Sequence, residues 1–467
     1  MKVNSEIFRA YDIRGIVDKD LTEEITYFLG KAIGTFIQLQ GRDSVVTARD
    51  GRISGDRLQH KFQEGVLSSG CNVLDIGKVP TPLLYFATFE NGISDGVMLT
   101  GSHNPKNYNG FKIVLDKKST TSEKIDEIKS IIFEERFWDG NGKLSFLNIK
   151  EQYLAKIKEK IKIKKPLKIC LDCGNGIGGV IAPEAFKLSG IELVELFTEV
   201  DGNFPNHHPD PSNPKNLVDL QNKVKETKSD LGIALDGDGD RVGLIDSDGE
   251  VIYPDKYMML LVEDILSKHK KGSIVYDVKC STNLEKLISD LNGTPVMSRT
   301  GHSYIKSKII ETDALLGGEM SGHIFFNDDW YGFDDAIYSA LRIIEVISKK
   351  NISSNKIFKK YPSFFSTPEI NISIPDQIKF KLIDEIKLHI KSTRFKYIDI
   401  DGVRLESETA WGLVRASNTS PNIVLRFEGQ TEKDLLEIKN YFKTILSKID
   451  NNFCLLYTSD AADESVG

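Results

Sequence analysis

The chain has 467 residues, of which 40% are hydrophobic and 28% charged, and its formal net charge is −7. This length allows roughly three or four domains, and the composition is typical of a soluble globular protein. The negative charge gives no overall basic field for a nucleic-acid partner, and no run of about 18 apolar residues indicates a membrane span. Because the N-terminus lacks the apolar run of a signal peptide, we expect a cytoplasmic protein that binds neither nucleic acid nor membrane.

A short apolar run, a polar turn and a helical stretch recur three times along the chain. The runs lie at 44–51, 168–176 and 273–281, and their β-branched residues, bounded by turn formers, indicate buried strands. Intervening helices predict α/β units with mainly parallel strands. Beyond them, residues 422–427 alternate like a strand and 432–449 have helical periodicity. We therefore predict an α/β protein with three domains of similar α/β topology and a smaller α+β domain at the C-terminus.

Turn-forming and polar segments indicate where these domains meet. We predict four domains at 1–148, 149–250, 251–362 and 363–453. Residues 454–467 resemble a translated sequencing adaptor, so we leave this tail out of the fold prediction.

Three aspartates alternate with glycines at 236–241, which reads Asp-Gly-Asp-Gly-Asp-Arg directly after an apolar run. The glycines let the backbone fold tightly enough for the carboxylates to converge, and hard oxygen ligands suit Mg²⁺. An EF-hand is excluded, because its sixth and twelfth positions would be arginine and serine. A polar turn without an ion is the alternative, but crowded carboxylates repel one another unless a cation compensates.

A serine and a histidine stand next to each other at 100–105, which reads Thr-Gly-Ser-His-Asn-Pro after another apolar run. A serine at the turn after a strand has the position of an activated nucleophile. The second glycine of a hydrolase elbow is missing. Taken alone, the segment is read more readily as an Asn-Pro turn.

Three further glycine- or hydroxyl-rich segments are each ambiguous alone. Residues 317–323 read Gly-Gly-Glu-Met-Ser-Gly-His, a loop that suits sugar hydroxyls or a plain turn. Residues 415–421 read Arg-Ala-Ser-Asn-Thr-Ser-Pro, which suits a phosphate or a surface loop. Residues 174–179 satisfy G-x-G-x-x-G, but a tight turn explains these glycines more simply than a nicotinamide site.

In this order, the segments resemble the α-D-phosphohexomutases over nearly the whole chain to about residue 453. Residues 8–15, Phe-Arg-Ala-Tyr-Asp-Ile-Arg-Gly, look like the family's opening motif. The segments at 100–105, 236–241, 318–323 and 415–421 are similar to its phosphoserine, metal, sugar and phosphate loops. The last two loops look most like those of the bacterial phosphomannomutase/phosphoglucomutase group. The resemblance implies four domains around a central cleft.

The resemblance also implies roles for particular residues. Ser102 would carry a phosphoryl group, and Mg²⁺ would be held by Asp236, Asp238, Asp240 and the phosphate on Ser102. The other residues expected near the reacting group are His103, Lys112, Arg14 and Arg241, with Lys112 a candidate general acid/base. The expected substrate-binding residues are Tyr11, Arg14, Lys279, His302, Glu319, Met320, Ser321, Gly322, His323, Arg415, Ala416, Ser417, Asn418 and Thr419.

The activity implied is the reversible transfer of phosphate between positions 1 and 6 of a hexose, which makes the protein an isomerase of hexose 1- and 6-phosphates of mannose and glucose. Glucose 1,6-bisphosphate would be its intermediate and activator. A phosphoglucosamine mutase, a metal-dependent phosphatase that transfers the phosphoryl group to water, and a non-enzymatic sugar-phosphate sensor stay open as alternatives. The sequence does not fix the oligomeric state, and a monomer is our working expectation.

Overall fold

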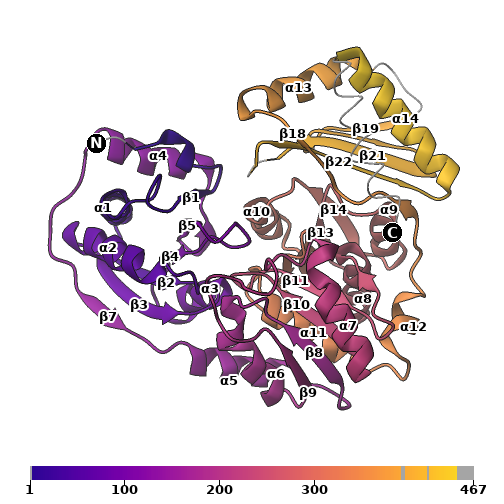
Figure 1. Cartoon of the computed structure of the whole chain (residues 1–467), viewed down its shortest axis with the longest axis horizontal. Coiled ribbons are helices and arrows are strands. Elements are labelled where there is room, and N and C mark those ends of the chain that lie inside the picture. The colour runs from indigo at the N-terminus through magenta and orange to yellow at the C-terminus, as the bar shows by residue number, and fades with distance from the viewer. Residues whose placement is uncertain (1–2, 391–394, 418–419, 450–467) are drawn as a thin grey trace.

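The computed structural model describes residues 3–390, 395–417 and 420–449. Figure 1 shows four units of secondary structure, which follow one another from the indigo N-terminal unit to the yellow C-terminal unit. The predicted adaptor-derived tail, 454–467, lies outside the described residues. Within them, no helix is both long and apolar enough to cross a membrane.

The first unit is a seven-stranded sheet with the strand order β1-β5-β4-β2-β3-β7, and β6 pairs with β5. Its longest helix begins after Thr22, whose side chain accepts a hydrogen bond from the Ile25 N–H, with two glutamates in the first turn. The strands are β1 (Asp12–Ile16), β2 (Ser44–Arg49), β3 (Asn72–Lys78), β4 (Gly96–Leu99), β5 (Tyr108–Leu115), β6 (Lys118–Ser119) and β7 (Leu144–Phe146). The helices are α1 (Glu23–Leu39), α2 (Gly55–Ser68), α3 (Thr81–Glu90) and α4 (Ser122–Phe133).

The second unit is a five-stranded sheet with the order β12-β11-β10-β8-β9, and the third is a four-stranded sheet with the order β14-β13-β15-β16. The second contains α5 (Lys150–Lys160), β8 (Lys168–Asp172), α6 (Ala182–Leu188), β9 (Glu192–Leu196), α7 (Val218–Thr227), β10 (Leu231–Leu235), β11 (Val242–Ile245) and β12 (Val251–Ile252). The third contains α8 (Pro254–His269), β13 (Ser273–Asp277), α9 (Thr282–Asp290), β14 (Thr294–Ser298), α10 (His302–Thr312), β15 (Leu316–Gly318), β16 (Ile324–Phe326), α11 (Ala336–Ser348) and α12 (Ser354–Phe358).

The three units repeat one arrangement of four strands. The corresponding orders are β5-β4-β2-β3, β11-β10-β8-β9 and β16-β15-β13-β14. In each, the middle strand pairs in parallel with both neighbours, and the fourth strand pairs antiparallel at one side. The prediction of three domains of similar α/β topology is therefore confirmed.

The fourth unit is a smaller, wholly antiparallel sheet covered by two helices (Figure 1). It has a hydrophobic core of its own, whereas one continuous core joins residues of the first three units. Its elements are β17 (Phe365–Ser366), β18 (Ile370–Ser373), α13 (Asp376–His389), β19 (Lys396–Ile398), β20 (Val403–Glu406), β21 (Ala410–Ala416), β22 (Asn422–Gly429) and α14 (Glu432–Ile449). This confirms the predicted α+β domain at the C-terminus.

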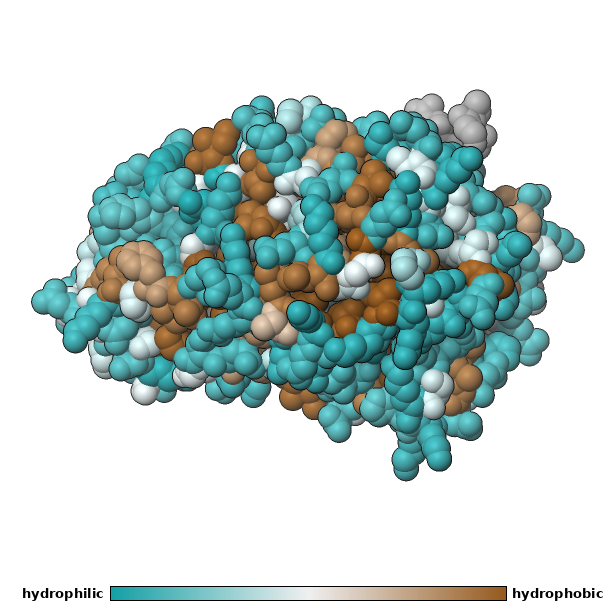
Figure 2. Space-filling view, turned by 90° about the horizontal axis from the view of Figure 1, so that it is seen from below, coloured by the Kyte–Doolittle hydropathy of each residue, from teal (hydrophilic) through white to brown (hydrophobic). Residues whose placement is uncertain are grey.

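The surface is mainly polar. In the view from below, a band of apolar residues crosses an otherwise hydrophilic face (Figure 2). The large apolar side chains exposed in the described residues include Leu144, Phe146 and Leu188.

Candidate active site

Ser102 lies on a tight loop between β4 and β5 that is held by hydrogen bonds of Thr100. Its backbone has a left-handed φ of 47°, a conformation that few residues other than glycine adopt. The loop is held there by Thr100, whose hydroxyl donates to Asp50 Oδ2 at 2.7 Å and accepts from the Ser102 N–H at 2.8 Å. Ser102 is only 3% exposed, and its Oγ lies 3.1 Å from His103 Nδ1. The sequence-predicted serine is thus presented with a histidine beside it.

Arg52 clamps the same loop and was missed by sequence reasoning. Its two terminal nitrogens donate to four backbone carbonyls, those of Ser102 at 2.8 Å, Asn104 at 2.6 Å, Pro105 at 2.7 Å and Tyr108 at 2.9 Å. The guanidinium is fully buried and also pairs with Asp50. The sequence offered a signal for Arg52. It lies directly after the run 44–51 that predicts a strand, and ligands of α/β proteins bind at this edge of the sheet.

The aspartates of the 236–241 loop, between β10 and β11, converge as predicted. All three are fully buried, and an oxygen from each lies within 4.8 Å of the others. Asp236 Oδ1 accepts the backbone N–H groups of Gly239, Asp240 and Arg241 at 3.0–3.1 Å. A side chain on Gly237 would collide with the carbonyl oxygen of Ser102, so the glycine lets the two loops touch.

The Ser102 loop and the 236–241 loop are joined through Ser102 and Asp236, and Lys112 bonds the other two aspartates. Ser102 Oγ donates to Asp236 Oδ2 at 3.2 Å, and Lys112 Nζ on β5 donates to Asp238 Oδ2 at 2.7 Å and also to Asp240 Oδ2. Burial lowers the pKa of Lys112, but Asp238 and Asp240 outweigh it and hold this pKa above its ordinary value. With the carboxylates bare, Lys112 is therefore a charged partner and does not have the lowered pKa expected of a general acid/base.

The donor set fits a hard divalent cation. Three carboxylates and the Ser102 hydroxyl supply only oxygen, and Asp238 Oδ1 is buried without a hydrogen-bond partner among the described residues. Burial and the charges of Asp240 and Asp238 raise the pKa of Asp236 well above its usual range. The charged form of Asp236 is thus disfavoured by its two neighbouring aspartates, which a bound cation would offset.

Residues 318–323, which we predicted to bind sugar, form the loop between β15 and β16 and lie against the 236–241 loop. The Val242 N–H donates to the Gly322 carbonyl at 3.0 Å, and Gly322 has a φ of +96°. Glu319, only 1% exposed, accepts from the Gly301 N–H and pairs with His323 Nδ1 at 2.9 Å. Ser321 Oγ lies 2.9 Å from the same nitrogen. Both oxygens of Glu319 therefore have protein partners in this structure.

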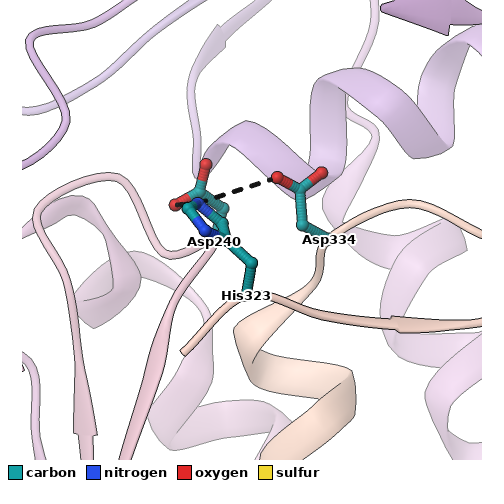
Figure 3. Close-up of side chains that lie close together, drawn as sticks. All are labelled: Asp240, His323 and Asp334. Atoms are coloured by element: carbon teal, nitrogen blue, oxygen red, sulfur yellow. Dashed lines mark ion pairs between the residues drawn. The ribbon is translucent and has the colours of Figure 1, made fainter. Parts of the chain in front are cut away.

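His323 stands between two carboxylates, Asp240 and Asp334 (Figure 3). Its Nε2 lies 3.3 Å from Asp240 Oδ1 and 3.9 Å from Asp334 Oδ2. Burial lowers the pKa of His323, but Asp240 and Glu319 hold it at about 10. Lys306 also pairs with Asp334, at 2.8 Å. These cations balance the group, so we interpret it as an ion-pair network.

His302, Tyr11 and Arg14 border the same region. His302 begins α10 and packs edge-on against the Tyr11 ring, with centroids 4.9 Å apart. Arg14 Nε pairs with Asp12 at 2.7 Å, and its Nη1 lies 3.5 Å from the carbonyl oxygen of Thr100, two residues before Ser102. The opening motif thus reaches the serine loop from strand β1.

The predicted phosphate-binding residues of the fourth unit are partly described. Arg415, near the end of β21, pairs through Nε with Asp401 at 2.8 Å, and Lys279 pairs with Glu369 at 2.8 Å. The Arg415 charge acts on both Lys279 and Tyr11, which places it in the same region. In the fourth unit, Ala416 ends β21 and the Ser417 hydroxyl accepts a hydrogen bond from the Ser420 N–H. In the third unit, the Met320 N–H donates to Asp277. Asn418 and Thr419 lie outside the described residues.

Models of the phosphoglucomutase/phosphomannomutase family match the chain four times. The alpha/beta/alpha domains I, II and III match residues 5–139, 151–249 and 253–364, and the C-terminal domain matches 369–444. A phosphomannomutase/phosphoglucomutase of Pseudomonas aeruginosa is 47% identical over 96% of this chain and 97% of its own. A Neisseria meningitidis phosphoglucomutase is 42% identical over 96% of this chain and 98% of its own.

A solved structure is also similar throughout. The crystal structure of a phosphoglucomutase/phosphomannomutase family protein from Burkholderia thailandensis superposes with a TM-score of 0.91 at 41% identity, covering 96% of this chain and 98% of that one. The resemblance to phosphohexomutases predicted from the sequence is confirmed. The chain is a phosphohexomutase that belongs to the phosphoglucomutase/phosphomannomutase family.

Proposed function

We propose that this enzyme interconverts the 1- and 6-phosphates of mannose and glucose, with Ser102 as the phosphoryl carrier. One observation carries the proposal: Ser102 Oγ lies 3.2 Å from Asp236 Oδ2, at the edge of a buried group of three aspartates. A hydroxyl in that position can bear a phosphoryl group only if cations offset the charge nearby. Three cations are close to this group: Lys112 and Arg241 bond the aspartates, and Arg14 reaches the carbonyl of Thr100.

Asp236, Asp238, Asp240 and an oxygen on Ser102 are the residues that would hold Mg²⁺. When bound, the ion would offset the negative charge of the phosphoryl group and polarise it for in-line attack. The unpartnered Asp238 Oδ1 and the raised pKa of Asp236 support this assignment. Asp236 Oδ1 stays occupied by three backbone N–H groups, so its other oxygen is the one available.

In the proposed reaction, a free hydroxyl of the substrate attacks the phosphorus on Ser102. The bond from phosphorus to Ser102 Oγ breaks as the bond to the sugar oxygen forms, and the proton of the attacking hydroxyl ends on Ser102 Oγ, which gives a hexose 1,6-bisphosphate and free Ser102. The intermediate, glucose 1,6-bisphosphate for glucose, turns round, and its other phosphate returns to Ser102. Burial and the Arg241 charge lower the pKa of His103 to about 3, so a neutral His103 lies 3.1 Å from Oγ.

Binding of the distant phosphate is assigned to Arg415, Lys279 and the 417–419 loop. Both cations are held by carboxylates, Asp401 and Glu369, which the dianionic phosphate of a substrate would replace through stronger charge-assisted bonds. Such a second phosphate site distinguishes a mutase from a phosphatase, because water needs no anchor for a remote phosphate. His302 and the 319–323 loop would then meet the sugar hydroxyls.

The experiment is to express Ser102→Ala and weigh the intact protein. We expect wild type to carry one phosphate and the variant none, with severely reduced turnover of mannose 1-phosphate and glucose 1-phosphate. Ser122→Ala is the control, because Ser122 is an exposed serine of the same unit. An active wild-type enzyme with its phosphate on another residue would refute the mechanism, and preferred turnover of glucosamine 1-phosphate would refute the substrate assignment.

A further inference from the structure

A loop of the second unit, residues 209–212, backs the metal loop. The Gly237 N–H donates to the Pro209 carbonyl at 3.1 Å. At Gly243 on β11, an added Cβ would lie 2.7 Å from Pro211 Cβ. The loop is therefore packed closely against both ends of the segment that carries the three aspartates, although nothing in its sequence marks it as functional.

Asp210, in this loop, holds the guanidinium of Arg241 from one side. Its Oδ1 lies 3.1 Å from Arg241 Nη1 and also accepts from Ser212 N at 3.1 Å and Ser212 Oγ at 2.6 Å. On the other side, Arg241 Nε donates to Asp236 Oδ2 at 3.2 Å, the oxygen that also accepts from Ser102. Arg241 Nη2 is buried and has no hydrogen-bond partner in the part of the chain described.

We infer that Asp210 is a positioning residue of the phosphoryl-transfer site. It holds Arg241 so that Nη2 stays available to a phosphoryl oxygen on Ser102, and so that the guanidinium does not close onto Asp236. The inference rests on the proposed function, since it assigns Arg241 to the phosphoryl group and Asp236 to the cation.

The expected consequence follows from how a guanidinium binds carboxylates. With two acids beside it, the Arg241 guanidinium bonds Asp236 through Nε and Asp210 through Nη1. Without the Asp210 charge, Asp236 is the remaining acid bonded to the guanidinium, which is then free to shift toward Asp236 Oδ2 and to bond it more strongly. Asp236 Oδ2 would then be a poorer cation ligand, and Nη2 would no longer be held available to the phosphoryl group.

The test compares Asp210→Asn with wild type and with Asp201→Asn. Asparagine keeps an acceptor for Ser212 and removes the charge. The control makes the same change at Asp201, whose side chain accepts hydrogen bonds from Asn203 N and Nδ2 in the described part of the chain. Mg²⁺ binding measured by calorimetry on the dephosphorylated proteins should weaken by about 10- to 100-fold in Asp210→Asn, the size of effect seen for partners that orient metal ligands. The same variant should lose kcat while the KM for hexose phosphates is unchanged.

Asp210→Glu provides the second variant, because it restores the charge and should recover most of the Mg²⁺ affinity. Unchanged Mg²⁺ affinity and kcat in Asp210→Asn, with only a lower unfolding temperature, would overturn the inference and leave Asp210 a structural residue. Failure of the proposed function looks different: wild type itself would bind no Mg²⁺ and carry no phosphate on Ser102, which would overturn the positioning role as well.

Discussion

Lys112 is the residue whose removal tests most directly how the three aspartates are held. It is 4% exposed, and its ammonium donates to Asp238 at 2.7 Å and to Asp240, both fully buried. Lys112→Met keeps a side chain of similar length and removes the charge. Breaking a buried ion pair by removing one partner costs about 3–5 kcal/mol, because the other charge stays buried without compensation.

Thermal unfolding in a chelator and in Mg²⁺ measures this cost. At about 2 °C per kcal/mol for a cooperative unit of roughly 250 residues, the Tm of Lys112→Met should fall by about 6–10 °C in the chelator. Mg²⁺ should bind the variant more tightly than wild type, because no ammonium competes for the carboxylate oxygens, and each tenfold gain in affinity adds about 1.4 kcal/mol of stability when the ion is in excess. The gap to wild type should therefore narrow when Mg²⁺ is added.

The matched control is Lys118→Met, which changes an exposed lysine on β6, next to β5. It should leave the Tm unchanged in both conditions. If Lys112→Met melted like wild type in the chelator, or if Mg²⁺ raised the Tm of both proteins equally, the aspartates would not depend on Lys112 for charge balance, and our reasoning would be wrong.

Two further predictions concern stability. Arg52→Lys removes donors from several of the four carbonyls of the 102–108 loop, at a cost of about 1–3 kcal/mol each. Hydrogen exchange of the backbone amides in this loop should therefore accelerate. Arg57→Lys, which changes the exposed ion pair with Asp18, should leave this exchange unchanged. A second prediction concerns Asp335, because burial raises its pKa to about 7. Between about pH 4 and pH 7 the folded protein therefore keeps a proton that the unfolded chain releases. The free energy of unfolding should fall by roughly 4 kcal/mol as the pH rises through this range. In urea titrations, the unfolding free energy of Asp335→Asn relative to wild type should therefore increase between pH 5 and 8. For Asp313→Asn, which changes an exposed aspartate, this difference should stay constant. The same pH dependence in both variants would contradict the prediction.

Much of the fold could be predicted from local patterns. The runs at 44–51, 168–176 and 273–281 contain β2, β8 and β13, the middle strands of the three repeats. A strand buried on both faces must be continuously apolar and must end in a turn, so it is visible in the sequence. Short strands such as β12 and β17, with two residues each, have too few side chains to show a pattern.

The site was predictable in its loops but not in its ion pairs. The aspartates are neighbours in sequence, so their convergence follows from the glycines between them. By contrast, Lys112 meets Asp238 across 126 positions and Arg241 meets Asp210 across 31. Such pairs depend on how the units pack, and a lone aspartate in a polar segment has no local feature that distinguishes it from a solvated turn.

The position of the site follows from the repeat itself. In each unit, the chain leaves the end of a parallel strand, β4, β10 or β15, and reverses into an antiparallel neighbour. The reversals are the loops at Ser102, at 236–241 and at 319–323. Each must turn tightly at the carboxyl edge of its sheet, where ligands of α/β proteins bind. Contacts then join the loops: Ser102 donates to Asp236, and Val242, directly after the 236–241 loop, donates to Gly322. Three copies of one strand–loop–strand arrangement thus supply the loops to which we assign the phosphoryl carrier, the cation and the sugar hydroxyls, and the proposed differences in chemistry reside in a few loop residues.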